Sequence, residues 1–387
     1  MQQSFEIVDR PSLQKHIERS LSESPVTVLL GARQTGKTTM AHIVMSGQPE
    51  SVIYDLERPT GRAPLEATPE LVLSGHNGLV VVDEIQRLPA LLEILRPLCD
   101  DPSIQARFLL LGSASPDIVR GVSESLAGRA LFIDIPGFSL EEVGTSQMGT
   151  LWLRGGFPRA FLADSDDAAF RWIEGFTRTF LERDIPALGV RVASATLRRF
   201  WTMLAHYHGQ TWNGSEIARA MDTSPKTANA YRDLLAGTFM IRVLPSWHEN
   251  VGKRQVKSPK VYIRDPGVLH HLLSITSMND LQSHPRYSAS WEGFALEEVL
   301  KRFGEQNAYF WSTQRGAELD LMLFRGGKRW GFEFKCTDAP ATTRSMHIAI
   351  QDLGLEHLYT VYPGTERFPM ARAISALPLT KIDQAFG

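Results

Sequence analysis

Short apolar runs separated by mixed segments dominate the first third of the chain. The runs VTVLL (26–30), LVVV (79–82) and RFLLL (107–111) show no alternation with polar residues. Continuous apolar character over this length predicts strands buried on both faces, as in a parallel sheet covered by helices. The segment TMAHIVMS, which follows the first run after a glycine-rich loop, has helical character. We therefore expect an α/β fold at this end of the chain.

The middle of the chain combines short helices with paired strands. NGSEIARAM (213–221) and DTSPKTANAYRDLL (222–235) predict two helices joined by a tight turn, with Ser224 as the cap and Pro225 first in the second helix. The strands TFMIRVLP and PKVYIRD enclose the basic segment SWHENVGKRQVKS. This order predicts a helix-turn-helix followed by a basic wing.

The last third begins with a helix and continues with strands. WEGFALEEVLKRF (291–303) predicts an amphipathic helix, and AYFWST (308–313) predicts a strand. AELDLMLF and WGFEFKCT then predict two strands joined by a tight Gly-Gly turn. Carboxylates and one lysine lie toward the ends of this expected hairpin.

Composition narrows the class of protein. A chain of 387 residues with 43% hydrophobic and 22% charged residues is expected to form two to four folded domains. The start lacks the pattern of a signal peptide and no apolar run approaches the length of a membrane span, so we expect a cytoplasmic protein with no membrane partner. Cys99 and Cys336 show no CxxC spacing, which excludes a disulfide framework and a cysteine zinc site.

Positive charge is concentrated in the middle of the chain. The net charge is −2, but residues 191–270 hold 12 Lys and Arg against 5 Asp and Glu. This segment therefore carries +7, which leaves −9 for the rest. We expect any affinity for a phosphate backbone to lie in this segment.

A nucleotide-binding motif follows the first predicted strand. It matches G-x-x-x-x-G-K-[ST] and predicts contacts to ATP from Gly31, Ala32, Arg33, Gln34, Thr35, Gly36, Lys37, Thr38 and Thr39. In such a loop the backbone N–H groups face the phosphates and the lysine reaches the β and γ oxygens. The hydroxyl of Thr38 is expected to hold Mg²⁺.

Catalytic side chains are expected at the ends of the next strands. Asp83 ends the second apolar run and is predicted to contact Mg²⁺ through water, while Glu84 polarises the attacking water. Ser113 ends the third run and is expected either to orient the same water or to form a plain turn. Arg129, in SLAGR, is expected either to project toward a neighbouring subunit as an arginine finger or to form a surface ion pair.

Several of these motifs together resemble a known family. RQTGKTT, VVVDEIQRLP, LLLGSAS and SLAGR, in this order, are similar to bacterial and archaeal AAA-type ATPases that carry a C-terminal domain of unknown function. The resemblance implies an α/β P-loop AAA+ core over residues 1–145 and a helical lid over 146–195. A winged helix-turn-helix is then expected over 196–268, and an α/β restriction-endonuclease-like domain over 269–387. It also implies a homo-oligomeric ring, expected to be a hexamer.

The predicted winged helix is the expected contact to DNA. Lys226 and Asn229 of its second helix lie away from the apolar face, and the wing carries Lys253, Arg254, Lys257 and Lys260. We expect backbone contacts with little sequence preference. The alternative is a lid or protein-docking module with a solvated basic face.

A second site is predicted near the C-terminus. Asp320 and Glu333 can converge on one hard cation, and Lys335 leaves the same strand face as Glu333. This D…E-x-K spacing after a helix bearing Glu297 resembles the restriction-endonuclease-like nuclease superfamily. The resemblance implies a metal-dependent nuclease site. The alternative is a nuclease-derived fold that serves assembly or binds phosphate without cleavage.

Three functions follow from these patterns. The first is an ATP-hydrolysing ring that moves along or remodels DNA, with branched DNA among its expected substrates. The second is an ATP-gated, metal-dependent DNA nuclease. The third is a nucleotide switch that scaffolds a protein partner, as in defence or toxin–antitoxin signalling.

Overall fold

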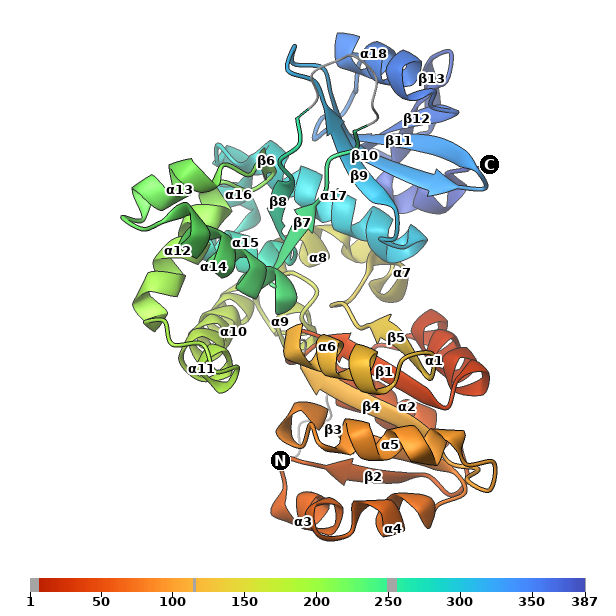
Figure 1. The fold of residues 1–387 in the computed structure, drawn as a ribbon. Helices are drawn as coiled ribbons and strands as arrows, with labels where there is room; N and C mark the ends of the chain where they lie inside the picture. The colour runs from red at the N-terminus through yellow and green to blue at the C-terminus, as the bar shows by residue number, and fades with distance from the viewer. Residues whose placement is uncertain (1–6, 114–115, 249–255, 387) are drawn as a thin grey trace. The chain divides into compact units, whose positions relative to one another are not determined.

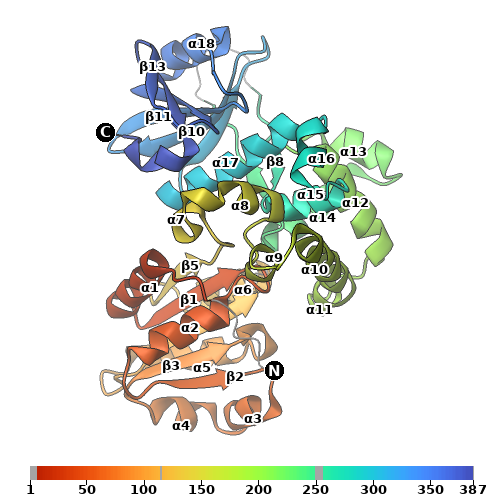
Figure 2. The same ribbon diagram turned by 180° about the vertical axis from the view of Figure 1, so that it is seen from behind.

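The computed structural model describes residues 7–113, 116–248 and 256–386 (Figures 1 and 2). The chain divides into two compact units, Met1–Gly137 with Gly237–Phe239, and Phe138–Ala236 with Met240–Gly387. Within the described ranges no helix combines the length and the apolar character that a membrane span needs.

A five-stranded, wholly parallel sheet forms the centre of the first unit. Its strand order is β2-β3-β4-β1-β5. The three predicted apolar runs supply its central strands, which are buried because helices cover both faces. The strands are β1 Val26–Gly31, β2 Val52–Asp55, β3 Leu79–Asp83, β4 Arg107–Ser113 and β5 Ala130–Asp134.

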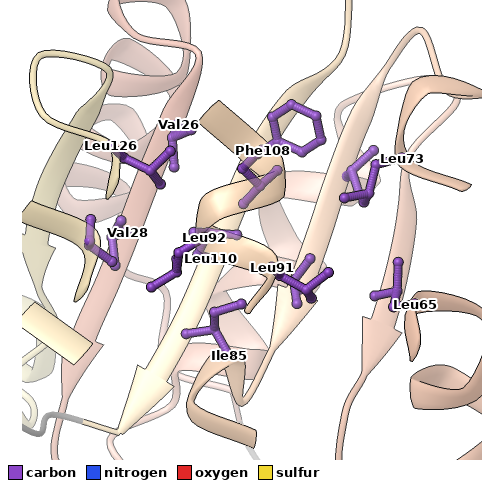
Figure 3. Packing of buried hydrophobic residues seen from close by; sticks show 14 of the residues in the cluster. Val26, Val28, Leu65, Leu73, Ile85, Leu91, Leu92, Phe108, Leu110 and Leu126 are labelled. Atoms are coloured by element: carbon purple, nitrogen blue, oxygen red, sulfur yellow. The ribbon is translucent and has the colours of Figure 1, made fainter. Parts of the chain in front are cut away.

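Alternate residues of the strands feed two separate cores. Val28 and Leu110 pack on one face with Leu92 of α5 (Figure 3), whereas Leu29 packs on the other face with Met40 of α2. The helices of this unit are α1 Pro11–Glu23, α2 Lys37–Ser46, α3 Pro59–Ala67, α4 Pro69–Ser74, η1 Ile85–Arg87, α5 Leu91–Asp100 and α6 Pro116–Ser125.

The second unit begins with a run of helices. Ser165 caps α10 by accepting a hydrogen bond from the Ala168 N–H, and Trp152 of α8 packs against Trp291 and Phe294. The elements are α7 Leu140–Val143, η2 Thr145–Gln147, α8 Met148–Arg154, α9 Pro158–Phe161, α10 Asp166–Thr179, η3 Phe180–Asp184 and α11 Ile185–Ala187.

Next come four helices and three short strands in the antiparallel order β6-β8-β7. The predicted turn is present, because Ser224 Oγ accepts from the Thr227 N–H and α14 starts at Pro225. The elements are α12 Ser194–His206, β6 Gln210–Thr211, α13 Gly214–Ala220, α14 Pro225–Gly237, β7 Ile241–Leu244, β8 Lys260–Ile263 and α15 Pro266–Leu272.

A six-stranded mixed sheet, in the order β13-β14-β12-β11-β10-β9, completes the second unit. Gly326 and Gly327 both have positive φ (59° and 74°), as the two-residue turn between β10 and β11 requires. The remaining elements are α16 Met278–Ser283, α17 Tyr287–Phe303, β9 Ala308–Ser312, β10 Glu318–Arg325, β11 Lys328–Phe334, α18 Arg344–Leu353, β12 His357–Tyr362, β13 Phe368–Ala371, β14 Ile374–Pro378 and η4 Leu379–Gln384.

Candidate functional site

The loop between β1 and α2 is tightly folded. A Cβ atom on Gly31 would lie 2.5 Å from the Ile135 carbonyl oxygen, so only glycine fits there. Gln34 and Gly36 have φ of 65° and 93°, which turns the chain back toward the start of α2. Arg10 donates to the Pro136 carbonyl at 3.1 Å and holds the neighbouring segment. The backbone thus makes a compact turn at a helix N-terminus, where anions bind.

Lys37, the first residue of α2, is buried within this loop. Its Nζ donates to the carbonyl oxygens of Gly31 at 3.0 Å and Ala32 at 2.7 Å. Burial lowers the pKa of Lys37 to about 8, although Glu84 and Asp83 oppose this shift. The ammonium is therefore still mostly charged at neutral pH, and these two hydrogen-bond acceptors are both neutral oxygens.

Thr38 and Asp83 come together across the sheet edge. Thr38 Oγ1 donates to Asp83 Oδ2 at 2.7 Å, and the Glu84 N–H donates to Asp83 Oδ1 at 2.9 Å. Glu84 has a φ of 60° and its carboxylate accepts from Gln86 Nε2. Burial raises the pKa of both Asp83 and Glu84. A raised pKa makes the carboxylate of Glu84 a better proton acceptor.

The other predicted residues of this site are placed as follows. Ser113 pairs with Gly31 in the β1–β4 register, and its buried hydroxyl has no hydrogen-bond partner among the described residues. Arg33 pairs with Glu57 at 3.0 Å, and Thr39 is exposed on α2. The groups gathered here fit a nucleoside triphosphate with Mg²⁺. They are a loop that requires glycine, a buried ammonium, and one hydroxyl hydrogen-bonded to a carboxylate.

Within the described residues, Arg129 forms an ion pair on the surface of its own chain. Its Nε and Nη2 donate to the two carboxylate oxygens of Asp100 at 2.7 and 2.8 Å, and Nη1 donates to the Ala127 carbonyl at 2.9 Å. A guanidinium held in this bidentate pair would have to leave Asp100 before it could reach a neighbouring subunit.

The residues predicted to contact DNA have different environments. Lys226 and Lys257 are exposed, whereas Asn229 Oδ1 accepts from Trp212 Nε1 at 2.8 Å. Lys253 and Arg254 lie outside the described residues. Lys260 requires a correction because it is only 3% exposed, and a buried ammonium cannot contact a DNA backbone.

The C-terminal hairpin brings together three of its four predicted residues. Asp320 and Glu333 each lie one residue beyond the Leu321–Phe332 pair of β10 and β11. Asp320 Oδ2 accepts from the Phe334 N–H at 3.1 Å. Lys335 Nζ donates to Glu333 Oε1 at 2.7 Å.

Glu297 is not part of this group, which is a second correction. Its carboxylate is held by Arg242, with Nη2 at 2.9 Å, and by Arg264 at 3.5 Å. Burial favours the neutral form, but the two guanidinium groups lower the pKa of Glu297 to about 2. Glu297 therefore serves an ion-pair network with Arg242 and Arg264.

Sequence reasoning missed Glu292 and the role of Lys260. Glu292 Oε1 accepts from the Tyr262 hydroxyl at 2.7 Å and lies 3.3 Å from Lys260 Nζ. Lys260 Nζ also lies 3.2 Å from Asp320 Oδ1 and pairs with Glu318. The signal in the sequence is the alternation K-x-Y in PKVYIRD, which places Lys260 and Tyr262 on one strand face.

Burial shapes the charges of this carboxylate cluster, which consists of Glu292, Glu318, Asp320 and Glu333. Burial and Asp320 raise the pKa of Glu333 to about 8, and burial raises the pKa of Glu292 to about 7. Burial alone would lower the pKa of Lys260, but the surrounding acids hold it well above its ordinary value. Lys260 is therefore charged.

The cluster does not fit a divalent metal ion. Lys260 Nζ occupies the point at which the carboxylates of Glu292, Glu318 and Asp320 meet. Among the residues that the structure describes, no group of three or more His, Cys, Asp or Glu is arranged to hold a metal.

Two curated proteins resemble nearly the whole chain. Uncharacterized protein Rv2008c of Mycobacterium tuberculosis and uncharacterized protein Mb2031c of Mycobacterium bovis are each 46% identical over 376 residues. The match covers 97% of this chain and 85% of either relative. The chain belongs to the family of these two proteins.

Matches to domain families divide this chain into three parts. Residues 23–144 match an AAA domain, which confirms the predicted AAA-type P-loop core. Residues 145–279 and 287–382 match two domains of unknown function, DUF8612 and DUF4143. The Walker-type ATPase PABY2304 of Pyrococcus abyssi shares the fold, with 17% identity, a TM-score of 0.51, and coverage of 69% of this chain and 96% of that one.

Proposed function

We propose that this chain is a Mg²⁺-dependent ATPase that acts on DNA as a homo-oligomeric ring. The observation that carries the ATPase activity is the hydrogen bond between Thr38 and Asp83, which joins segments 45 residues apart at 2.7 Å. This pair is the arrangement that a Mg²⁺ site needs beside a phosphate-binding loop.

Each side chain has a defined role in this proposal. Lys37 leaves the carbonyl oxygens of Gly31 and Ala32 for the phosphates of ATP, because charged acceptors make stronger hydrogen bonds than neutral ones. The Thr38 hydroxyl would hold Mg²⁺, and Asp83 would contact the ion through water. At this position the ion would supply positive charge against the phosphate oxygens.

The attacking water is assigned to Glu84 and Ser113. Glu84 lies directly after Asp83 and its raised pKa suits a proton acceptor. Ser113, at the end of β4 beside Gly31, has a buried hydroxyl with no hydrogen-bond partner among the residues that the structure describes. We propose that it orients the same water.

The segment predicted to form a winged helix supports an action on DNA. It holds the helices α13 and α14, joined by a tight turn and followed by the strands β7 and β8, and residues 191–270 carry a local charge of +7. Lys226, at the start of α14, and Lys257, just before β8, are exposed and can contact phosphates. The resemblance to AAA-type ATPases supports a ring, for which we propose six subunits.

The test is the ATPase rate of the full chain with Mg²⁺, titrated with single-stranded, duplex and four-way-junction DNA. DNA should raise the rate of the wild type. The double variant Lys226→Glu/Lys257→Glu should keep the basal rate and lose the stimulation. The logarithm of the DNA-binding constant falls linearly with the logarithm of the salt concentration, and each lost phosphate contact should make this slope shallower by about 0.9.

Lys328→Glu is the matched control. Lys328 is an exposed lysine paired with Glu356 on the C-terminal sheet, so its reversal should leave the DNA response intact. A rate that no DNA changes would refute the action on DNA and favour the nucleotide switch. Light scattering with ATP tests the ring, and a monomer under all conditions would refute it.

A further inference from the structure

One face of β8 supplies a cation to the carboxylate cluster. Lys260 and Tyr262 leave β8 on the same side and both reach Glu292 of α17. Lys260 also contacts Asp320 and Glu318 of β10. Three carboxylates from two elements therefore converge on one buried ammonium.

Two of the three contacts between Lys260 and the carboxylates have lengths that suit an ammonium ion. Asp320 Oδ1 and Glu292 Oε1 lie 3.2 and 3.3 Å from Lys260 Nζ, which are hydrogen-bond lengths. Mg²⁺ requires oxygen ligands at about 2.0–2.1 Å, so the same oxygens would have to move inward by about 1 Å. Burial prevents the easy departure of Lys260, whose removal would leave like charges facing one another.

We propose that the ammonium of Lys260 takes the place of a divalent metal ion in the carboxylate cluster, so that the C-terminal sheet does not cleave phosphodiester bonds. The other acceptor atoms are also engaged. Asp320 Oδ2 accepts from the Phe334 N–H, and Glu333 pairs with Lys335 at 2.7 Å. What remains is Glu333 Oε2, which has no hydrogen-bond partner among the described residues, and one oxygen atom cannot hold a divalent ion by itself.

The same contacts lock two sheets together. Lys260 belongs to the three-stranded sheet, whereas Asp320 belongs to the six-stranded sheet. Backbone hydrogen bonds reinforce this junction: the Trp247 N–H donates to the Phe310 carbonyl at 2.7 Å, and the Phe310 N–H donates to the Pro245 carbonyl at 3.0 Å. The internal cation thus ties the helix-turn-helix segment to the C-terminal sheet.

The inference does not rest on ATP hydrolysis or DNA binding, and its test omits nucleotide. The full chain is titrated with Mn²⁺ by calorimetry, as wild type, Asp320→Asn, Lys260→Met and Lys260→Met/Asp320→Asn. Only a site that Asp320→Asn removes is assigned to the cluster, which sets aside any Mn²⁺ at Thr38 and Asp83. Lys257→Met, which changes an exposed lysine three residues away, is the matched control.

We expect wild type, Asp320→Asn and Lys257→Met to bind the same number of Mn²⁺ ions. Lys260→Met should gain one site per chain, and the double variant should lose it again. Saturating Mn²⁺ should also raise the Tm of Lys260→Met by several degrees more than it raises the Tm of the wild type, since only the variant binds the ion at this cluster.

A wild-type Mn²⁺ site that disappears in Asp320→Asn would overturn the proposal. So would metal-dependent cleavage of plasmid DNA by the wild type that Asp320→Asn abolishes. A folded Lys260→Met that gains no site would also overturn it. If Lys260→Met does not fold, the comparison of wild type with Asp320→Asn decides by itself, because equal Mn²⁺ binding and no cleavage support the internal cation.

Discussion

Gly31→Ala should destabilise the first unit by distorting the nucleotide loop. The new Cβ would lie 2.5 Å from the Ile135 carbonyl oxygen and 3.1 Å from Thr35 Oγ1. The nearer contact is between a Cβ fixed to the backbone of β1 and a backbone oxygen, so β1 and the segment after β5 must separate by about 1 Å to restore van der Waals distance. Overpacking of this kind costs about 1–3 kcal/mol.

The separation also strains a neighbouring hydrogen bond. The Ile135 N–H donates to the Leu30 carbonyl at 2.6 Å, directly beside Gly31. Losing it adds about 1 kcal/mol, for a total of about 2–4 kcal/mol. In a unit of this size the Tm should then fall by roughly 10 °C, and ATP should bind more weakly.

Thermal unfolding of the two units can be followed separately, because the chain's 8 tryptophans lie between residues 152 and 330, in the second unit. Tryptophan emission therefore reports on the second unit, whereas circular dichroism reports on both. Circular dichroism should show an earlier transition in Gly31→Ala, while the tryptophan emission transition should stay in place. Gly47→Ala is the matched control: its Cβ would meet nothing closer than 3.7 Å and its φ is −90°. A Gly31→Ala protein that melts within about 1 °C of the wild type and binds ATP normally would refute the reasoning.

Three further predictions concern single side chains. Arg129→Ala should lower kcat by less than about tenfold in steady-state ATPase assays, because Arg129 pairs with Asp100 in its own chain. A loss of about 10³-fold would instead show that Arg129 acts as an arginine finger. Ser113→Ala should lower kcat by about tenfold, which corresponds to the loss of one hydrogen bond. Tm and ATP affinity should not fall, since the Ser113 hydroxyl has no hydrogen-bond partner among the described residues. An unchanged kcat would contradict the proposed role of Ser113. Glu333 has a folded pKa of about 8 against an ordinary 4.5, so the folded chain holds a proton that the unfolded chain releases, and the free energy of unfolding should fall as pH rises through this window. Glu333→Gln should flatten that slope in urea unfolding followed by tryptophan emission, and an unchanged slope would assign it to other groups.

The geometry of the candidate nucleotide site was predictable because the residues that form it lie in a few short segments of the sequence. The glycines, Lys37 and Thr38 lie within one short loop, and apolar runs on either side identify the strands that hold it. Asp83 and Glu84 follow a second such run, and parallel strands end at the same sheet edge. The Thr38–Asp83 hydrogen bond is the contact that this reasoning implies.

The C-terminal cluster was only partly predictable because its members meet across long stretches of chain. Glu292 and Glu297 are five residues apart on α17, about 140° around the helix axis, so they face different surroundings. Nearly all of α17 from Ser290 to Leu300 is buried, so apolar periodicity does not reveal which face meets β10. Likewise, the basic run before β8 does not reveal that Lys260 turns inward while Lys257 stays exposed.

The central claim is that the loop between β1 and α2 binds ATP for hydrolysis, and separating binding from turnover tests it most directly. ATP binding and phosphate release should be measured with Mg²⁺ for wild type, Lys37→Ala and Glu84→Gln. The account predicts that Lys37→Ala loses both ATP binding and phosphate release. Glu84→Gln should still bind ATP, but its rate of phosphate release should fall by a factor of about 10²–10⁴. Equal turnover in all three proteins would contradict it.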